Sequence, residues 1–278
     1  MKVINKQILA DVQNIKITKL EIIAPAIAEK AKAGQFVVVM ASDKGERIPL
    51  TIVDADKEKG SVTLILQEVG LTTKLLGRLN KGESVYAITG PLGHPTEIAS
   101  YGKIILVGGG VGIAEIYPVA KAMKKAGSYV ISVLGARTKE LLILENEMKS
   151  VSDEVHIATD DGSYGKKGFT VDILKELLVG SKASPIALVY AVGPIPMMKR
   201  VAAVTKEFGV KTLVSLNALM IDATGMCGCC LVTIAGNVKF SCVDGPEFEA
   251  SDVDWQELEK RSKIYITQEA HICKLNKL

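Results

Sequence analysis

A short stretch in the last quarter of the chain gathers residue types that hold metals. Asp222 is followed by Cys227, Cys229 and Cys230, and Cys242 lies a little further on. Four of the five cysteines therefore fall within sixteen residues. Thiolate sulfur is a soft ligand that selects zinc and iron–sulfur clusters. Outside the secretory pathway, clustered cysteines indicate metal binding rather than disulfides.

The spacing of these residues favours a two-iron cluster. A Cys-x4-Cys-x2-Cys run with a distant fourth cysteine holds many [2Fe–2S] clusters. Cys227 and Cys230 form the Cys-x2-Cys pair, Cys242 is the distant residue, and counting back across four residues from Cys227 gives Asp222. We therefore predict Asp222, Cys227, Cys230 and Cys242 as metal ligands, with Cys229 as a spare thiol. A structural zinc site of the four cysteines is the alternative, although adjacent cysteines seldom turn both sulfurs toward one metal. Asp222 would then be a turn or helix-capping residue.

The composition describes an ordinary globular protein and excludes several classes. The chain has 278 residues, enough for two domains, with 48% hydrophobic and 23% charged residues. A net charge of +3 is too small to indicate a nucleic-acid partner. No apolar run is long enough to cross a bilayer, and the N-terminus does not open a signal peptide, so we expect a cytoplasmic protein. Cys273 is expected to be a partly buried hydrophobe.

Residues 1–95 predict an antiparallel β-barrel. Short apolar runs recur there between turn signals such as Ala33-Gly34 and Lys59-Gly60. The predicted strands are Ile15–Ile22, Phe36–Met40, Leu50–Val53, Val62–Leu66 and Val85–Ile88, with one helix at Thr72–Leu79. Two segments contain residue types that could bind a ligand. Arg47–Thr51 places a cation and a hydroxyl at a strand entry, and Gly70–Thr73 offers free amides for a phosphate at a helix start. Taken alone, each segment favours a structural interpretation, with Arg47 as a solvated loop charge and Thr72 as a simple N-cap.

Residues 96–214 predict a doubly wound parallel sheet, which begins after a turn and plausible hinge at Gly90–Gly93. Buried strands alternate with helices in this region, and such a fold binds ligands at the carboxyl ends of its strands. The predicted strands are Lys103–Val107, Tyr129–Leu134, Glu154–Thr159 and Ile186–Ala191, and the helices are Ile113–Lys125, 138–149, 170–178 and Pro196–Phe208.

Glycines follow the first of these strands. Gly109, Gly110, Val111 and Gly112 do not complete a Gly-x-Gly-x-x-Gly motif, but they still allow a dinucleotide pyrophosphate to approach the backbone at a helix start. A tight turn without ligand is the alternative. Arg137 follows the second strand where a ribose-binding carboxylate is usual, so it either favours a 2′-phosphate or faces solvent. The choice between NAD and NADP is therefore left open.

Two further loops follow the third and fourth strands, where a nicotinamide would lie. They contain Asp161, in a glycine-rich turn that could equally be a solvated bend, and Gly193-Pro194. Residues 215–278 then form the predicted cluster module. Within it, Leu231–Ile234 and Val238–Phe240 predict a hairpin that brings Cys242 toward Cys230, and Asp254–Ser262 predicts a surface helix.

This order of barrel, nucleotide-binding sheet and cluster loop resembles the ferredoxin-NADP reductase superfamily. More closely, it resembles the electron-transfer subunits of class B dihydroorotate dehydrogenase, whose [2Fe–2S] loop ends in Cys-x-Asp-Gly-Pro-x-Phe, matched here by Cys242–Phe248. The first ligand in those subunits is cysteine. Asp222 instead resembles a sister family, the small (alpha) subunit of NADH-dependent ferredoxin:NADP oxidoreductase, also known as the sulfide dehydrogenase beta subunit. Arg47–Thr51 and Gly135–Lys139 resemble that family too.

The resemblance implies cofactor sites on both folds. FAD would lie on the barrel, with its flavin lined by Arg47, Pro49, Leu50 and Thr51 and its pyrophosphate held by Gly70, Thr72 and Thr73. The Arg-x-Tyr-Ser motif of the superfamily is not intact, since Leu50 replaces the tyrosine and Ile48 the arginine. The pyridine nucleotide would be held by Gly109, Gly110, Val111, Gly112, Asp161, Gly193 and Pro194.

The function implied by the resemblance is that of a flavin iron–sulfur electron-transfer subunit. Hydride would pass between NAD(H) and FAD, and single electrons between FAD and the [2Fe–2S] cluster, without a catalytic acid or base. The partner would be a larger subunit with a second FAD and [4Fe–4S] clusters, which reacts with NADPH and ferredoxin in electron bifurcation. A dihydroorotate dehydrogenase catalytic subunit is the alternative partner. A regulatory module with a structural zinc is the alternative of another class.

Overall fold

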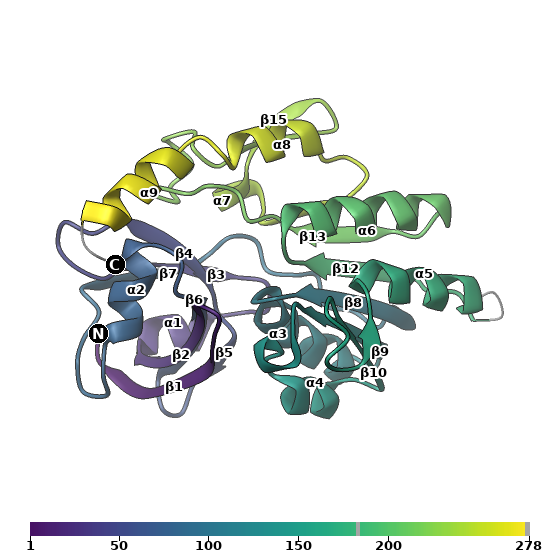
Figure 1. The fold of residues 1–278 in the computed structure, drawn as a ribbon, viewed down its shortest axis with the longest axis horizontal. Helices are drawn as coiled ribbons and strands as arrows, with labels where there is room; N and C mark the ends of the chain where they lie inside the picture. The colour runs from purple at the N-terminus through teal and green to yellow at the C-terminus, as the bar shows by residue number, and fades with distance from the viewer. Residues whose placement is uncertain (182–183, 276–278) are drawn as a thin grey trace. The chain divides into compact units, whose positions relative to one another are not determined.

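Antiparallel sheets form the N-terminal part of the computed structural model (Figure 1). The structure describes residues 1–181 and 184–275, with the backbone alone at residues 270 and 273–275. The chain divides into two units. The first unit contains Met1–His94, Ala218–Pro246 and the residues from Asp254 onward, and the second contains Pro95–Asn217 and Glu247–Val253. The segment that carries the cysteines thus shares a unit with the N-terminal sheets.

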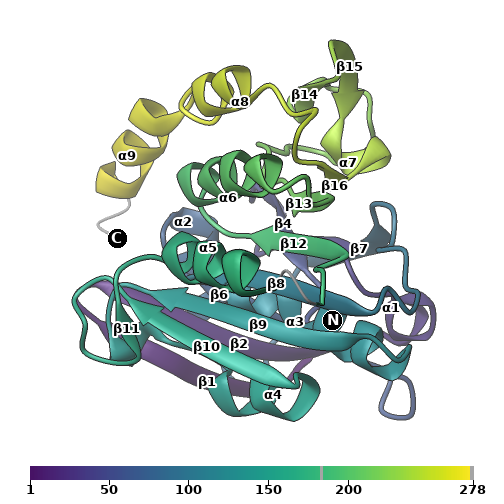
Figure 2. The ribbon, with the colours of Figure 1, turned by 90° about the vertical axis from the view of Figure 1, so that its right-hand side faces the viewer.

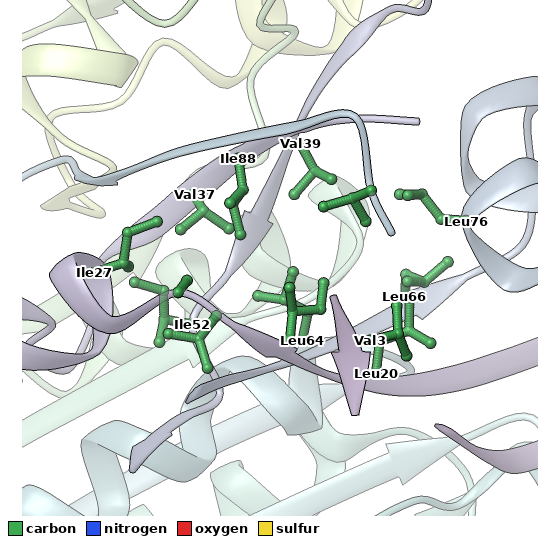
Figure 3. Packing of buried hydrophobic residues seen from close by; sticks show 14 of the residues in the cluster. Val3, Leu20, Ile27, Val37, Val39, Ile52, Leu64, Leu66, Leu76 and Ile88 are labelled. Atoms are coloured by element: carbon green, nitrogen blue, oxygen red, sulfur yellow. The ribbon is translucent and has the colours of Figure 1, made fainter. Parts of the chain in front are cut away.

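Two sheets enclose one hydrophobic core in the first unit. One has the order β1-β2-β6-β5 and the other β4-β3-β7. Leu20 and Leu64 from the first sheet and Val37 and Val39 from the second are fully buried, and Figure 3 shows their side chains turned toward one another. Burial of each such side chain stabilises the fold by about 1.5–3 kcal/mol. The elements are β1 (Val3–Val12), β2 (Ile15–Ile23), α1 (Pro25–Lys30), β3 (Phe36–Met40), β4 (Arg47–Thr51), β5 (Asp54–Asp56), β6 (Ser61–Gln67), α2 (Leu71–Arg78) and β7 (Ala87–Leu92).

The predicted N-terminal antiparallel fold is confirmed, with β1, β5 and α1 as additions. β1 escapes sequence reasoning because the polar run Asn5–Gln7 interrupts its apolar residues and only Val3 and Ala10 are buried, as suits a strand at the edge of its sheet.

A seven-stranded sheet forms the second unit, with the order β11-β10-β9-β8-β12-β13-β16. All pairs are parallel except β13 with β16. Helices α3 and α4 pack on one face and α5 and α6 on the other (Figure 2). The elements are β8 (Lys103–Gly109), α3 (Gly112–Lys125), β9 (Tyr129–Ala136), α4 (Glu145–Val151), β10 (Glu154–Thr159), β11 (Lys166–Lys167), α5 (Thr170–Gly180), β12 (Leu188–Val192), α6 (Ile195–Glu207), β13 (Thr212–Ser215) and β16 (Glu247–Glu249).

The predicted doubly wound sheet is confirmed, with one helix corrected. The helix predicted at 138–149 is a 3-10 turn at Lys139–Leu141 followed by α4, which begins only at Glu145. Leu144 adopts a left-handed conformation with φ of 56°, which interrupts a continuous helix. Burial of Leu141, Ile143 and Leu144 holds this irregular segment in place.

The segment that follows β13 in the chain folds around a hairpin in the first unit. β14 (Leu231–Ile234) pairs with β15 (Asn237–Phe240), as predicted, and α7 (Ser241–Asp244), α8 (Trp255–Arg261) and α9 (Ile266–Leu275) follow. The Asp254 amide donates to the Thr233 carbonyl oxygen, and its carboxylate caps α8, so the helix is fixed to the hairpin. Cys273 lies in α9, but its side chain is outside the described part of the chain. Within the residues described, no helix combines the length and apolarity needed to span a membrane.

Candidate iron–sulfur loop and nucleotide-binding turns

Three left-handed backbone positions shape the loop that precedes β14. Ala223, Gly225 and Gly228 have φ values of 59°, 79° and 73°. Glycine adopts this conformation freely, whereas alanine does so at a cost of roughly 1–2 kcal/mol. A Cβ atom at Gly225 would lie 3.0 Å from a methyl carbon of Val243, so the loop is also closely packed there. These bends turn a short segment back on itself and gather its polar side chains.

The predicted ligands meet as two pairs. The Asp222 carboxylate interacts with the Cys227 side chain, which lowers the pKa of that carboxyl. The Sγ atoms of Cys230 and Cys242 lie 3.2 Å apart, as the predicted hairpin requires. Cys227 is exposed, whereas Cys230 and Cys242 are almost completely buried. Cys229 is half-buried and interacts with Cys227.

Asp222 stabilises a turn in the loop and carries a negative charge there. Its Oδ1 atom accepts a hydrogen bond from the Thr224 amide at 3.0 Å, which is the turn role anticipated from the sequence. This amide and the Cys227 thiol hold the pKa of the Asp222 carboxyl below its usual value, and the Arg47 guanidinium of β4 lowers it further. Asp222 therefore presents an anionic oxygen atom beside a thiol.

The buried thiol pair must lose protons before it can bind metal. Burial, and then the neighbouring Cys230, raise the pKa of Cys242 to about 12, and the Gly225 amide only partly opposes this. Metal binding requires thiolates, so loading of this loop releases protons.

The donor set fits an iron–sulfur centre better than a single zinc ion. A structural zinc draws four ligands to one point at about 2.0–2.3 Å. Among the residues that the structure describes, no three His, Cys, Asp or Glu side chains converge in this way. The oxygen and sulfur donors instead form two pairs, Asp222 with Cys227 in the loop and Cys230 with Cys242 of α7, and soft thiolates predominate, as iron–sulfur centres require.

The predicted flavin residues occupy β4 and the start of α2 in the same unit. Arg47 is exposed at the beginning of β4, and Pro49, Leu50 and Thr51 are half-buried along the strand. Thr73 Oγ1 accepts hydrogen bonds from the Gly70 and Val69 amides at 2.9 and 3.0 Å, so it caps α2.

The hydroxyl of Thr72 has a partner that the sequence did not suggest. Thr72 is buried and donates to Glu46 Oε2 at 2.8 Å. In this arrangement neither Thr72 nor Thr73 offers an uncommitted hydroxyl to a phosphate, and the backbone at Gly70 is the open part of the segment, since a Cβ atom there would meet nothing within 4 Å.

The predicted nucleotide-binding glycines lie where the order of the second unit's sheet reverses. The chain proceeds outward from β8 through β9 and β10 to β11 and then returns to β12 on the other side of β8. Ligands of open α/β sheets bind at such a switch point, beyond the carboxyl ends of the strands. The turn from Gly109 to Gly112 and the turn at Gly193-Pro194 follow the two adjoining strands, β8 and β12.

Both turns approach each other closely. A Cβ atom at Gly112 would lie 2.4 Å from the carbonyl oxygen of Val192, and one at Gly193 would lie 3.2 Å from the Cα of Gly109. Gly110 has φ of 58° and open space around it, with Val111 next in the turn. Gly110 is therefore the point where a ligand can reach the backbone.

Arg137 and Asp161 follow the next two strands at the same edge. The Asp161 amide donates to the Arg137 carbonyl oxygen at 3.3 Å, so the two loops adjoin. The Asp161 carboxylate accepts hydrogen bonds from the amide and hydroxyl of Ser163, which lower its pKa. Asp161 thus stabilises its own turn, as the solvated-bend interpretation anticipated.

Sequence reasoning missed two polar groups. Arg261, predicted only as part of a surface helix, donates through Nη2 to the carbonyl oxygens of Gly228 and Cys229. In the second unit, Thr96 and Tyr190 both donate to Glu247 Oε1, the tyrosine at 2.7 Å. Burial raises the pKa of Glu247. These groups are far apart in sequence and belong to no motif, so no local signal announces them.

Known protein families match both halves of this arrangement. Residues 217–254 match the iron–sulfur cluster binding domain of dihydroorotate dehydrogenase B, and residues 106–203 match an oxidoreductase NAD-binding domain. The first match covers the loop with Asp222, Cys227, Cys230 and Cys242, and the second begins in β8 and includes both glycine turns.

Relatives match over most of the chain. A dihydroorotate dehydrogenase B (NAD(+)) electron transfer subunit homolog from Thermotoga maritima is 49% identical over 246 residues, which cover 88% of this chain and 86% of the relative. An electron transfer subunit of the same name from a Geobacillus species is 36% identical, with 82% of this chain and 88% of the relative covered.

A solved structure extends the comparison to the fold. The structure of an NADH-dependent reduced ferredoxin-NADP oxidoreductase, studied for flavin-based electron bifurcation, superposes with a TM-score of 0.90 at 44% identity, covering 97% of this chain and 95% of the other. Identity, coverage and the two matched domains agree. The chain belongs to the family of dihydroorotate dehydrogenase B electron-transfer subunits, which have a ferredoxin reductase-like fold with NAD-binding and iron–sulfur domains.

Proposed function

We propose that this chain is the NAD(H)-linked subunit of an electron-bifurcating NADH-dependent ferredoxin:NADP oxidoreductase, with FAD on its barrel and a [2Fe–2S] cluster in its cysteine loop. The observation that carries the proposal is Asp222. Four residues separate it from Cys227, so it occupies the position where the two-iron spacing expects a cysteine, and the Cys227 side chain helps to keep its carboxyl anionic by lowering its pKa. The 44% identity to a solved bifurcating oxidoreductase supports the same assignment.

The pairing of the ligands supports a two-iron cluster. Each iron of a [2Fe–2S] cluster takes two protein ligands. Sulfurs bound at about 2.3 Å to one tetrahedral metal lie roughly 3.7 Å apart. The 3.2 Å between the Sγ atoms of Cys230 and Cys242 is close to this value, so a small opening of the pair would admit one iron. Asp222 and Cys227 would hold the other.

The proposed flavin and cluster segments belong to the same unit and interact electrostatically. Arg47, the first of the residues proposed to line the flavin, acts electrostatically on Asp222 of the cluster loop. Pro49, Leu50 and Thr51 continue from it along β4, and Gly70, Thr72 and Thr73 would lie beside the pyrophosphate. A short separation between the two sites is what direct electron exchange between them requires.

The cofactors supply the chemistry, namely hydride exchange with a nicotinamide and single-electron exchange with an iron–sulfur centre. The chain's own residues bind and orient these groups. Gly109, Gly110, Val111 and Gly112, with Gly193 and Pro194, present open backbone to the nucleotide at the switch point of the sheet, with Arg137 and Asp161 in the adjoining loops. No side chain is required as a catalytic acid or base.

The surface around the cluster loop supports a protein partner. Met226 is 87% exposed beside Cys227, and Ile221 and Val243 are 45% and 42% exposed. Apolar side chains gathered at an exposed redox loop are typical of an interface. The proposed partner is a larger subunit with a second FAD and [4Fe–4S] clusters, which would react with NADPH and ferredoxin.

Purification of the native complex tests this function. The chain, tagged in its native host, should copurify with a larger subunit, and the complex should show flavin absorbance with iron and acid-labile sulfide in equal amounts. It should couple NADPH oxidation to the reduction of both NAD and ferredoxin. Replacement Asp222→Cys should leave the cluster in place but change its EPR signal and reduction potential. A colourless zinc protein, or an Asp222→Cys variant with an unchanged signal, would contradict the proposal.

A second candidate is supported by the named relatives. The match of residues 217–254 and the 36% identical Geobacillus subunit are both of the dihydroorotate dehydrogenase B type. If the copurified partner oxidises dihydroorotate and the complex does not reduce ferredoxin, this function replaces the first.

A further inference from the structure

Arg261 connects α8 to the cluster loop. It is the last residue of α8, and its Nη2 atom donates to the carbonyl oxygens of Gly228 and Cys229 at 3.1 and 3.3 Å. The helix that carries it is itself fixed, because Asp254 caps its first turn and Leu258 is 2% exposed. The guanidinium therefore holds two successive peptide groups of the loop from a rigid support.

Holding these carbonyls also orients the amides. In a trans peptide the N–H group points opposite to the C=O of the same unit. The units whose carbonyls belong to Gly228 and Cys229 carry the amides of Cys229 and Cys230. Both N–H groups are therefore directed away from Arg261. Hydrogen bonds to cluster and ligand sulfurs are one of the means by which a protein sets a cluster's reduction potential.

One atom of the half-buried Arg261 side chain indicates a nearby negative charge. The Nε atom is buried and has no hydrogen-bond partner among the described residues. A buried charged donor without a partner is costly, so such a group normally lies close to an opposite charge. The carboxylate and thiolates proposed as ligands provide that charge once the loop is loaded, and it increases by one unit when a two-iron cluster is reduced.

We propose that Arg261 is a positioning residue that raises the reduction potential of the iron–sulfur centre, through its charge and through the two peptide groups that it holds. This inference rests on the proposed cluster in the loop. The reduced cluster has more negative charge than the oxidised one, so a fixed positive charge nearby stabilises the reduced form. Removal of that charge should therefore make reduction less favourable.

Potentiometric titration of the purified, cluster-loaded protein, followed by EPR, tests the proposal. We expect Arg261→Gln to lower the ratio of reduced to oxidised cluster at least tenfold at a given ambient potential, which for one electron is 59 mV. Lys260→Gln is the matched control, because it removes the same charge from the neighbouring, exposed position of α8. Exposed charges are screened, so the control should change the ratio less than twofold. Arg261→Lys keeps the charge but replaces the planar donor, so its shift should be intermediate.

The outcomes separate this proposal from the proposed function. If the wild-type protein binds no iron–sulfur cluster, the proposed function fails. If the wild type is loaded but Arg261→Gln shifts the potential no more than Lys260→Gln, Arg261 does not tune the cluster and the function stands. If Arg261→Gln does not load, Arg261→Lys decides, and a wild-type potential and EPR signal in that variant overturn the proposal. If neither variant retains iron, the residue is structural and the tuning role is likewise overturned.

Discussion

Replacement of Gly112 by alanine is the sharpest test of the nucleotide-binding turns. The added Cβ atom would lie 2.4 Å from the carbonyl oxygen of Val192 and 3.1 Å from the Cα of Gly193. Both contacts are with backbone, which cannot rotate away as a side chain can. Relief of the first contact from 2.4 to 3.0 Å requires the ends of β8 and β12 to separate by about 0.6 Å. The change therefore acts on the geometry of the switch point itself.

The expected cost follows from the rigidity of these contacts. Overpacking a closed site typically destabilises a protein by about 1–3 kcal/mol. Part of this cost is offset, because alanine is more favourable than glycine within a helix by roughly 0.5–1 kcal/mol. We expect Gly112→Ala to lower the free energy of unfolding by about 1–2 kcal/mol. The displaced turns should also bind NADH about tenfold more weakly, which corresponds to roughly 1.4 kcal/mol.

Two neighbouring glycines supply the controls. Gly110→Ala is a control for stability only, because Gly110 is where a ligand can reach the backbone. It introduces strain at φ of 58° but meets no atom within 4 Å, so it should cost about 1–2 kcal/mol without moving the turns. A Cβ atom at Gly109 would lie 2.5 Å from the Sδ atom of Met197, a flexible side chain that can move, so this cost should be smaller than that of Gly112→Ala. Urea unfolding and calorimetric titration with NADH measure both quantities. Wild-type stability and NADH affinity in Gly112→Ala would refute the reasoning.

Two further predictions concern polar groups of the fold. Glu247→Gln should stabilise the protein at neutral pH, because burial raises the folded-state pKa of this carboxyl and the ionised form is the costly one. The gain, about 1.4 kcal/mol for each unit by which the pKa is raised, should disappear as pH falls below about 4.5, where Glu247 is protonated in both the folded and the unfolded state. If the difference in melting temperature between Glu247→Gln and the wild type were the same at pH 4 and pH 8, this reasoning would be contradicted. Thr73→Val should lower the free energy of unfolding by about 1 kcal/mol because the Gly70 amide loses its cap, while Thr73→Ser should keep it. A chemical denaturation midpoint for the valine variant equal to that of the serine variant would exclude the capping role.

The cysteine loop and the glycine turns were recognisable in the sequence because they depend on local chemistry. Cys227 and Cys230 have the spacing that a bent loop needs to present two thiolates, and a hairpin predicted from its turn residues brings Cys242 back beside Cys230. The strands of the second unit are long apolar runs, and their alternation with helices predicts a parallel sheet and its switch point. Spacing and periodicity are properties of neighbouring residues, so no knowledge of distant contacts was needed.

Other features were decided only by tertiary structure. Arg261 and Glu247 have partners more than thirty residues away, and no pattern along the chain links such residues before the elements pack. Leu144 leaves the helical conformation because burial of its neighbours outweighs local propensity. The hydroxyl of Thr72 donates a hydrogen bond to Glu46, a pairing that the sequence does not indicate. Local chemistry determined which residues can bind a metal or a nucleotide, and packing decided which of their polar atoms are already committed, because a buried donor must find its partner wherever the fold places one.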